Sequence, residues 1–217
     1  MTEPERTDHR RRLPPALIGL FLLLLLAGCG GGPELARLPP GTVVLAFGDS
    51  LTAGTGAGSG EDYPSRLAAL SGLQVINAGI PGEQSAQGLA RLPGLLAEHR
   101  PALVLLCHGG NDILRRSDGE QLRADLRANF RGMIEAARAS GADVMLLAVP
   151  TLGLGLRPHP AYADLAKEHG LVIEQRALTD VLSDPALKAD GVHPNGAGYG
   201  LLAERLDRLL RERGALP

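Results

Sequence analysis

Short apolar runs recur along the chain from residue 42 onward, and each is bounded by glycine, proline, asparagine or aspartate. The runs are rich in valine, isoleucine and leucine and are too short for helices, so they predict buried strands of a parallel sheet. Five strands are expected, over Val43–Phe47, Gln74–Asn77, Leu103–Cys107, Val144–Val149 and Leu171–Ile173.

Stretches with helical periodicity lie between these runs. The clearest is Gln121–Ala139, where apolar residues recur every three or four positions and form one face. Further helices are expected over Tyr63–Leu70, Gln84–His99, Ala161–Glu168 and Tyr199–Leu210, and Pro93-Gly94 predicts a kink or break in the second of these. Alternating strands and helices with short links predict a three-layer α/β/α sandwich around a parallel sheet of about five strands.

The N-terminal residues have the pattern of an export signal. Several arginines precede the apolar stretch from Ala16 to Ala27, which is short of the ~20 residues that cross a bilayer and is typical of a secretory signal. Leu26-Ala27-Gly28-Cys29 resembles a bacterial lipobox, and this resemblance implies that Cys29 is acylated and becomes the first mature residue. A simple signal anchor, or a cleaved signal with an incidental cysteine, is the alternative.

Domain boundaries follow from this interpretation. Residues 1–28 are predicted to be a lipoprotein signal peptide, residues 29–41 a flexible tether rich in glycine and proline, and residues 42–217 a single folded domain. The absence of aspartate after Cys29 favours the outer membrane, by resemblance to lipoprotein sorting signals.

Composition narrows the possible partners. The formal net charge is −2 and no long basic stripe is present, so a nucleic-acid partner is not expected. No cluster of residues has metal-ligand spacing, so no metal is expected. Cys107 ends an apolar run and is expected to be a small core residue, and nothing in the chain demands an oligomer, so a monomer is expected.

Three residues have the chemistry of acyl transfer. Ser50 follows the first predicted strand in Gly48-Asp49-Ser50-Leu51, and Asp190 and His193 lie three positions apart far downstream. A serine hydroxyl is a poor nucleophile until a base takes its proton, and an imidazole needs a partner that fixes its tautomer. Ser50, His193 and Asp190 supply a nucleophile, a base and an orienting carboxylate.

The distinctive polar and glycine-rich segments all follow strands. Gly79–Gly82 comes after the second predicted strand, Gly109–Asp112 after the third, and Asp190–His193 after the fifth. Binding sites of open parallel sheets form beyond the carboxyl ends of the strands. These segments and Ser50 are therefore expected to form one site.

These segments, in this order, resemble the four blocks of the GDSL/SGNH hydrolase family, and Gln87–Pro93 further resembles its multifunctional thioesterase, arylesterase and lysophospholipase branch. The resemblance implies a flavodoxin-like SGNH hydrolase fold and no cofactor. It also implies an oxyanion hole formed by the Ser50 N–H, the Gly82 N–H and the Asn111 amide. Gly82 is preferred to Gly79 because the family places its donor glycine just before an acidic residue, here Glu83.

The expected function is a membrane-tethered periplasmic serine esterase that works through an acyl-enzyme. Its expected substrates are small acyl esters or lipids: aryl esters, acyl thioesters or lysophospholipids. A carbohydrate O-deacetylase or acetyltransferase of the same fold, and a non-catalytic lipoprotein that binds an envelope partner, are the alternatives. Two further features are expected near the site: His108 as a pocket residue and Leu152–Pro160 as a wall of the acyl pocket.

Overall fold

The central sheet places the ends of its strands, and the loops that follow them, at one edge. The computed structural model describes residues 32–115, 119–151 and 155–217. The strand order of the central sheet is β2-β1-β3-β4-β7, and all neighbouring strands are parallel. The strands are β1 (Val43–Gly48), β2 (Gln74–Gly79), β3 (Leu103–Cys107), β4 (Asp143–Leu147) and β7 (Val172–Glu174). All five predicted strands are confirmed: β3 has the predicted bounds, and the ends of the others are shifted by at most two residues.

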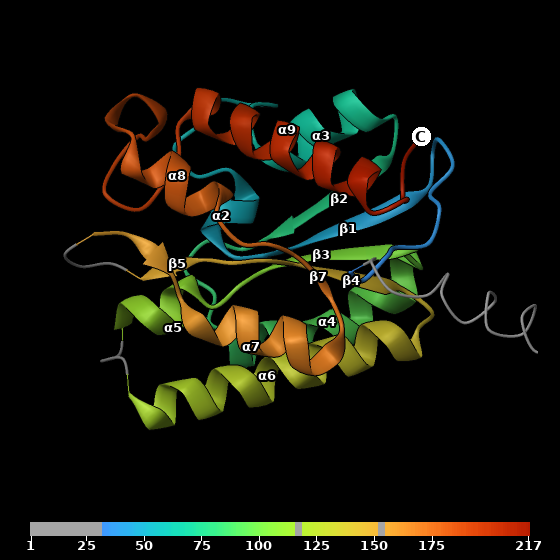
Figure 1. The fold of residues 1–217 in the computed structure, drawn as a ribbon, viewed down its shortest axis with the longest axis horizontal. Coiled ribbons are helices and arrows are strands. Elements are labelled where there is room, and N and C mark those ends of the chain that lie inside the picture. Colours follow the sequence, from blue (N-terminus) through green and yellow to red (C-terminus); the bar gives the residue numbers. More distant parts are fainter. Residues whose placement is uncertain (1–31, 116–118, 152–154) are drawn as a thin grey trace, which may run out of the picture. The chain divides into compact units, whose positions relative to one another are not determined.

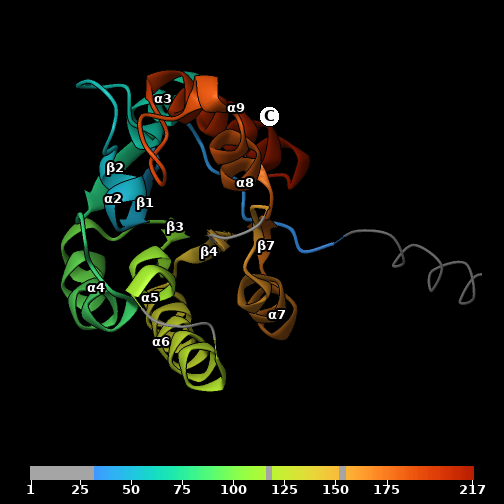
Figure 2. The same cartoon turned by 90° about the vertical axis from the view of Figure 1, so that its left-hand side faces the viewer.

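Helices cover both faces of this sheet, which confirms the predicted three-layer sandwich (Figures 1 and 2). One face carries α3 (Tyr63–Ser71), α8 (Ala177–Ser183) and α9 (Gly196–Glu212), and the other carries α4 (Ser85–His99), α6 (Glu120–Ala139) and α7 (Pro160–His169). In α6 the apolar face predicted from the sequence is buried, since Leu122, Leu126, Phe130 and Met133 are almost wholly covered. Burial of such side chains is the main force that holds the layers together.

The break predicted in the second helix is wrong. Helix α4 runs without interruption from Ser85 to His99 and includes Pro93. Proline has no N–H, so the carbonyl four residues before Pro93 has no helical donor. Pro93 and Gly94 lie on the exposed side of the helix, where water can donate to this carbonyl. Leu92 and Leu96 are buried on the inner side and hold the two halves of the helix against the sheet.

Several short elements were not predicted. Helix α2 (Ser50–Ala53) follows β1 directly, α5 (Gly110–Arg115) follows β3, and β5 (Pro150–Thr151) pairs with β6 (Arg157–Pro158) in a small antiparallel hairpin. A four-residue helix and a two-residue strand are too short to show a periodicity in the sequence. Helices α2 and α5 lie at the carboxyl edge of the sheet (Figure 1).

A flexible tether was expected over residues 29–41, but in the structure the second half of this segment is hydrogen-bonded to the domain. The Leu35 and Leu38 amides donate to the carbonyls of Arg213 and Ala215 at 3.0 and 2.8 Å, and the Ala36 amide donates to the Asp143 carboxylate at 2.8 Å. Leu38 is 3% exposed. This segment is therefore part of the domain, whose compact unit begins at Pro33 rather than at residue 42.

The predicted signal peptide and Cys29 lie outside the described residues. In the described part of the chain, no helix combines the length and the apolar character needed to cross a membrane.

Candidate active site

Ser50 is the first residue of α2 and lies where β1 ends. The turn is tight because Gly48 packs so closely on the Cys107 carbonyl that any Cβ there would overlap it. The Asp49 carboxylate accepts a hydrogen bond from the Leu51 amide at 3.1 Å and caps α2. The strand end and the cap together place Ser50 at the sheet edge, where it is partly exposed.

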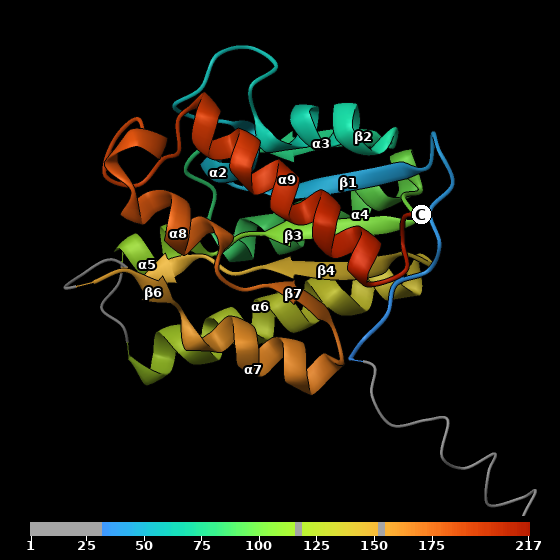
Figure 3. The same cartoon turned by 45° about the horizontal axis from the view of Figure 1, so that its top comes forward.

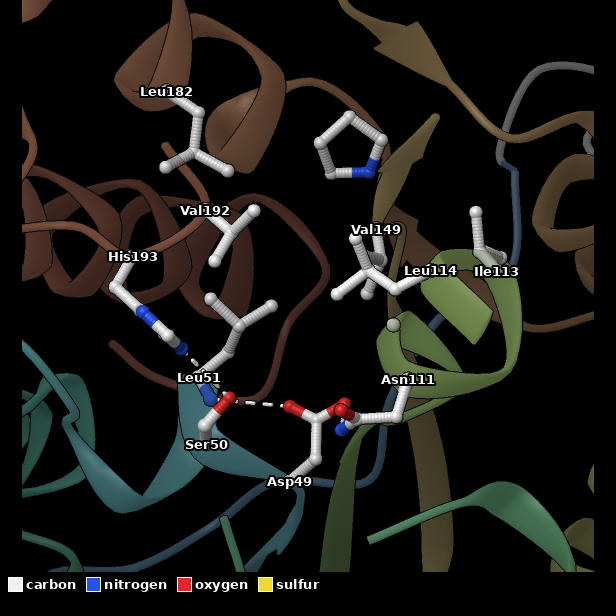
Figure 4. A pocket seen from close by; sticks show the side chains of 12 residues that line it. Asp49, Ser50, Leu51, Asn111, Ile113, Leu114, Val149, Leu182, Val192 and His193 are labelled. Atoms are coloured by element: carbon white, nitrogen blue, oxygen red, sulfur yellow. Dashed lines mark hydrogen bonds between the residues drawn. The ribbon is translucent and has the colours of Figure 1, made fainter. Parts of the chain in front are cut away.

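A line of two hydrogen bonds joins Ser50 to the loop that precedes α9. The distance from Ser50 Oγ to His193 Nε2 is 3.0 Å, and the distance from His193 Nδ1 to Asp190 Oδ2 is 2.8 Å. Figure 4 shows the His193 ring pointing at the Ser50 hydroxyl. The structure therefore brings a serine together with an imidazole that lies 143 positions further along the chain, and with the carboxylate beside it.

The Asp190 carboxylate is held by its own loop. Its Oδ1 atom accepts hydrogen bonds from the Val192 and His193 amides, both at 2.8 Å, which leaves Oδ2 for the imidazole. The hydrogen bond from His193 and those from the two amides hold the pKa of Asp190 below its usual range. An ionised Asp190 requires a proton on Nδ1 of His193, so Nε2 is free to accept from the Ser50 hydroxyl.

Asn111, at the start of α5, faces the same space from the other side. Its Nδ2 atom donates to the Glu83 carbonyl at 3.1 Å and contacts Asp49 Oδ2 at a longer 3.4 Å. The first contact fixes the plane of the amide, and the second is weak enough to be exchanged for a better acceptor. Asp49 itself is 1% exposed, and burial raises the pKa of its carboxyl.

The two glycines considered for the oxyanion hole have different roles in the structure. Gly79 lies against the Ala53 backbone, where any Cβ would overlap it, so its small size serves packing. Gly82 has φ +79, a left-handed conformation that favours glycine, and a Cβ there would meet little besides Arg115. The Gly82 peptide thus lies in a turn, which the Glu83 amide closes by donating to Ile80 O at 3.2 Å.

An apolar pocket opens beside Ser50. Figure 4 shows its side chains around the hydroxyl. The lining is contributed by α2, α5, β5, α8 and the Asp190 loop, and its apolar members are Leu51, Ile113, Leu114, Val149, Pro150, Leu182 and Val192. Of the expected acyl wall Leu152–Pro160, residues 152–154 lie outside the described residues, and none of the others lines this pocket.

His108 was expected near the pocket, and the structure places it elsewhere. It is fully buried behind the site, where its Nε2 atom lies 3.1 Å from the Glu83 carboxylate. Arg91 of α4 binds the same carboxylate. This cluster was not predicted from the sequence, where the position of Glu83 directly after Gly82 is its one visible sign.

Within the described ranges, no group of three or more histidine, cysteine or acidic side chains is placed to hold a metal ion. A hydroxyl, an imidazole and a carboxylate in hydrogen-bonded order, at the carboxyl edge of a parallel sheet, are the arrangement of serine hydrolases.

Comparison with known proteins gives the family. The model of the GDSL-like Lipase/Acylhydrolase family matches residues 46–201, and the chain belongs to this family. It is an ester-hydrolysing enzyme of the serine hydrolase class.

Two bacterial relatives match over most of their length. Esterase TesA of Pseudomonas aeruginosa is 36% identical over 199 residues, which covers 84% of this chain and 94% of that protein. Thioesterase 1/protease 1/lysophospholipase L1 of Escherichia coli is 32% identical over 200 residues, which covers 88% of this chain and 90% of that protein. A crystal structure of TesA has a TM-score of 0.67 at 34% identity and covers 79% of this chain and 99% of that one.

Proposed function

We propose that Ser50 is the nucleophile, His193 the general base and acid, and Asp190 the carboxylate that orients His193. The observation that carries this proposal is the pair of hydrogen bonds of 3.0 and 2.8 Å that links the three side chains. Catalytic hydroxyl and imidazole groups need this distance for proton transfer.

The reaction proceeds in two halves. Ser50 Oγ attacks the acyl carbonyl while its proton passes to His193 Nε2, and the resulting imidazolium is stabilised by Asp190. His193 then gives this proton to the departing alcohol or thiol, which leaves an acyl group on Ser50. In the second half water loses a proton to Nε2 and attacks the acyl carbon, and the proton returns to Ser50 as the acid leaves.

The negative oxygen formed in each half would be stabilised by the Ser50 N–H, the Gly82 N–H and the Asn111 amide. The contact from Asn111 to Glu83 O keeps the amide in place, and the long contact to Asp49 is given up for the oxyanion. Such donors stabilise the charge of the transition state more than that of the ground state, so they act mainly on kcat.

Replacing Asn111 by alanine is expected to lower kcat by ~10²–10³-fold, because one oxyanion donor is lost while the nucleophile and base remain. Steady-state kinetics on an aryl ester measure this. Gln121→Ala is the control, since the Gln121 amide bonds Asp125 on the exposed side of α6. A loss of less than about threefold in Asn111→Ala would remove Asn111 from the oxyanion hole.

The substrates proposed are acyl esters with an apolar acyl group, among them aryl esters, acyl thioesters and lysophospholipids. The apolar side chains beside Ser50 support this, because they would cover an alkyl chain attached to the reacting carbonyl. Hydrolysis of p-nitrophenyl esters from acetate to octanoate, together with labelling by a fluorophosphonate probe, tests it. The expected result is one label per chain on the Ser50 peptide and turnover of the aryl esters, whereas cleavage of acetylated sugars without aryl-ester turnover would contradict it.

The chain is proposed to be held at the periplasmic side of the outer membrane by lipid on Cys29. The support is the sequence Leu26-Ala27-Gly28-Cys29 at the end of the apolar stretch. Cys29→Ala is expected to move the enzyme from the membrane fraction to the soluble fraction of expressing cells, with the activity per molecule unchanged. Cys107→Ala is the control that leaves the tether intact, and an unchanged distribution of Cys29→Ala would refute the anchor.

A further inference from the structure

A buried ion-pair cluster lies directly behind the site and has no part in the steps above. Arg91 Nε and Nη2 donate to Glu83 Oε1 and Oε2 at 2.9 and 2.6 Å, a two-point contact between guanidinium and carboxylate. Glu83 Oε2 also accepts from His108 Nε2 at 3.1 Å. The Glu83 side chain is 7% exposed and His108 is fully buried.

The protonation state of His108 follows from its neighbours. The Gly109 amide donates to His108 Nδ1 at 2.9 Å, so this nitrogen holds a lone pair and the ring proton is on Nε2, which donates to Glu83. The Tyr162 hydroxyl donates to the His108 carbonyl at 2.6 Å and holds the residue's backbone. The cluster therefore consists of one anion, one cation and one neutral donor, so its charges are balanced.

Each member of the cluster is tied to another part of the fold. Arg91 also donates to the Ala78 carbonyl at 3.0 Å at the end of β2, and its guanidinium lies 4.5 Å from the centre of the Phe47 ring on β1. Burial raises the pKa of Glu83, but the hydrogen bonds from Arg91 and His108 outweigh it and hold the pKa below its usual value. Glu83 is thus an ionised side chain anchored to two strands.

The backbone of Glu83 faces the reaction site. Its carbonyl accepts the hydrogen bond from Asn111 Nδ2 at 3.1 Å, and its peptide nitrogen is joined to Gly82. One residue, anchored by its side chain, is therefore bonded to Asn111 and adjacent in the chain to Gly82, the two proposed oxyanion donors from outside α2. The amide and hydroxyl of Ser85 bond the Asp112 carboxylate, both at 2.8 Å, and join the same two segments.

We propose that Glu83, held by Arg91 and His108, is a positioning residue that fixes the Gly82 N–H and the Asn111 amide for the oxyanion. This inference rests on the proposed function, which assigns those two donors. Glu83 touches no substrate and acts through its main chain. Displacement of a catalytic group by about 1 Å can cost ~10²-fold in rate, so a small shift of this segment is sufficient to slow the reaction.

Glu83→Gln tests this directly, because it keeps the main-chain carbonyl and the size of the side chain but removes the charge and one of the two acceptors for Arg91. We expect kcat to fall ~10-fold or more while KM changes less than about threefold, since the lost interaction is made in the transition state. Arg131→Gln is the matched control, because the ion pair of Arg131 with Glu168 has the same 2.6 Å length on the surface. It should leave kcat within about twofold.

A double-mutant cycle with Asn111→Ala separates positioning from general damage to the fold. If Glu83 acts through the oxyanion donors, Glu83→Gln should lower kcat by a smaller factor in the Asn111→Ala background than in the wild type, about a third of that factor or less. The same factor in both backgrounds, or an unchanged kcat in Glu83→Gln alone, would overturn the proposal. If Glu83→Gln does not fold, Arg91→Lys is interpreted in the same way, because it keeps the cation while it removes the two-point contact with Glu83 and, with it, the guanidinium contacts to Ala78 O and the Phe47 ring.

Failure of this inference differs from failure of the proposed function. A large loss in Asn111→Ala with none in Glu83→Gln or Arg91→Lys would reject the positioning role alone. No loss in Asn111→Ala would reject the assignment of Asn111 as a donor in the proposed function, which is a different result.

Discussion

Ser50→Ala is expected to lower kcat/KM for aryl esters by about 10⁵–10⁶-fold. Without the hydroxyl no acyl-enzyme can form. Oxyanion stabilisation and substrate binding remain, and they keep the rate above that of the reaction in water. The substitution removes one oxygen atom from a partly exposed position, so thermal unfolding should be nearly unchanged.

Two further variants make this result specific. His193→Ala added to Ser50→Ala should cause little further loss, because the base has no hydroxyl left to activate. Ser59→Ala is the control, since Ser59 is an exposed serine on the loop between α2 and α3 and should leave kcat/KM within about twofold. A Ser50→Ala protein that retains more than about 1% of the wild-type rate would mean that another residue is the nucleophile.

Asp190→Asn is expected to lower kcat by about 10⁴-fold, although the side chain keeps its shape. In the structure Asp190 Oδ1 is held by two backbone N–H groups, so the amide oxygen of the substituted side chain would take that place and its NH₂ would face His193 Nδ1. Nδ1 would then have to accept a hydrogen bond, so the ring proton would move to Nε2. Nε2 faces Ser50, and once it carries a proton it cannot accept the proton of the Ser50 hydroxyl. Kinetics over a pH range of about 5 to 9 check this, and Asp207→Asn, which removes a surface partner of Arg211, is the control.

The same substitution has a consequence for stability with a definite sign. The pKa of Asp190 is lowered in the folded protein, so its ionised form stabilises the fold above the usual pKa of aspartate. This contribution is lost as the pH falls through the lowered pKa. The difference in melting temperature between the wild type and Asp190→Asn should therefore be largest near neutral pH and should shrink toward a pH of about 3, and a difference that grows in acid would contradict the assignment.

The sheet and the positions of its loops could be predicted because its three central strands, β1, β3 and β4, are buried almost throughout. A strand such as Leu103–Cys107, with all five residues covered, is a continuous apolar run in the sequence and is recognisable without any partner. Parallel strands then send the segments after Gly48, Gly79 and Cys107 to the same edge, so the grouping of Ser50 with Asn111 follows from topology alone.

What could not be predicted depends on contacts between distant positions. Arg91, Glu83 and His108 belong to a helix, a loop and a strand end, and no spacing rule relates them. His108 can reach Glu83 because Gly88 on α4 leaves room for its ring, which is a property of the assembled layers. The same holds for Pro93, whose effect on α4 was decided by the exposed side on which it falls.

The first described residues join the domain at the end of the sheet that lies away from Ser50. Leu35 and Ala36 are bonded to Arg213 and to Asp143, where β4 begins, whereas Ser50 is the first residue of α2. Figure 3 shows α2 and the start of β4 at opposite ends of the sheet. The six residues of β1 alone separate these two poles by about 20 Å. The chain that follows Pro33 is thus bound to the domain at the pole opposite to its catalytic mouth, so its contacts with Arg213 and Asp143 leave the approach to Ser50 open.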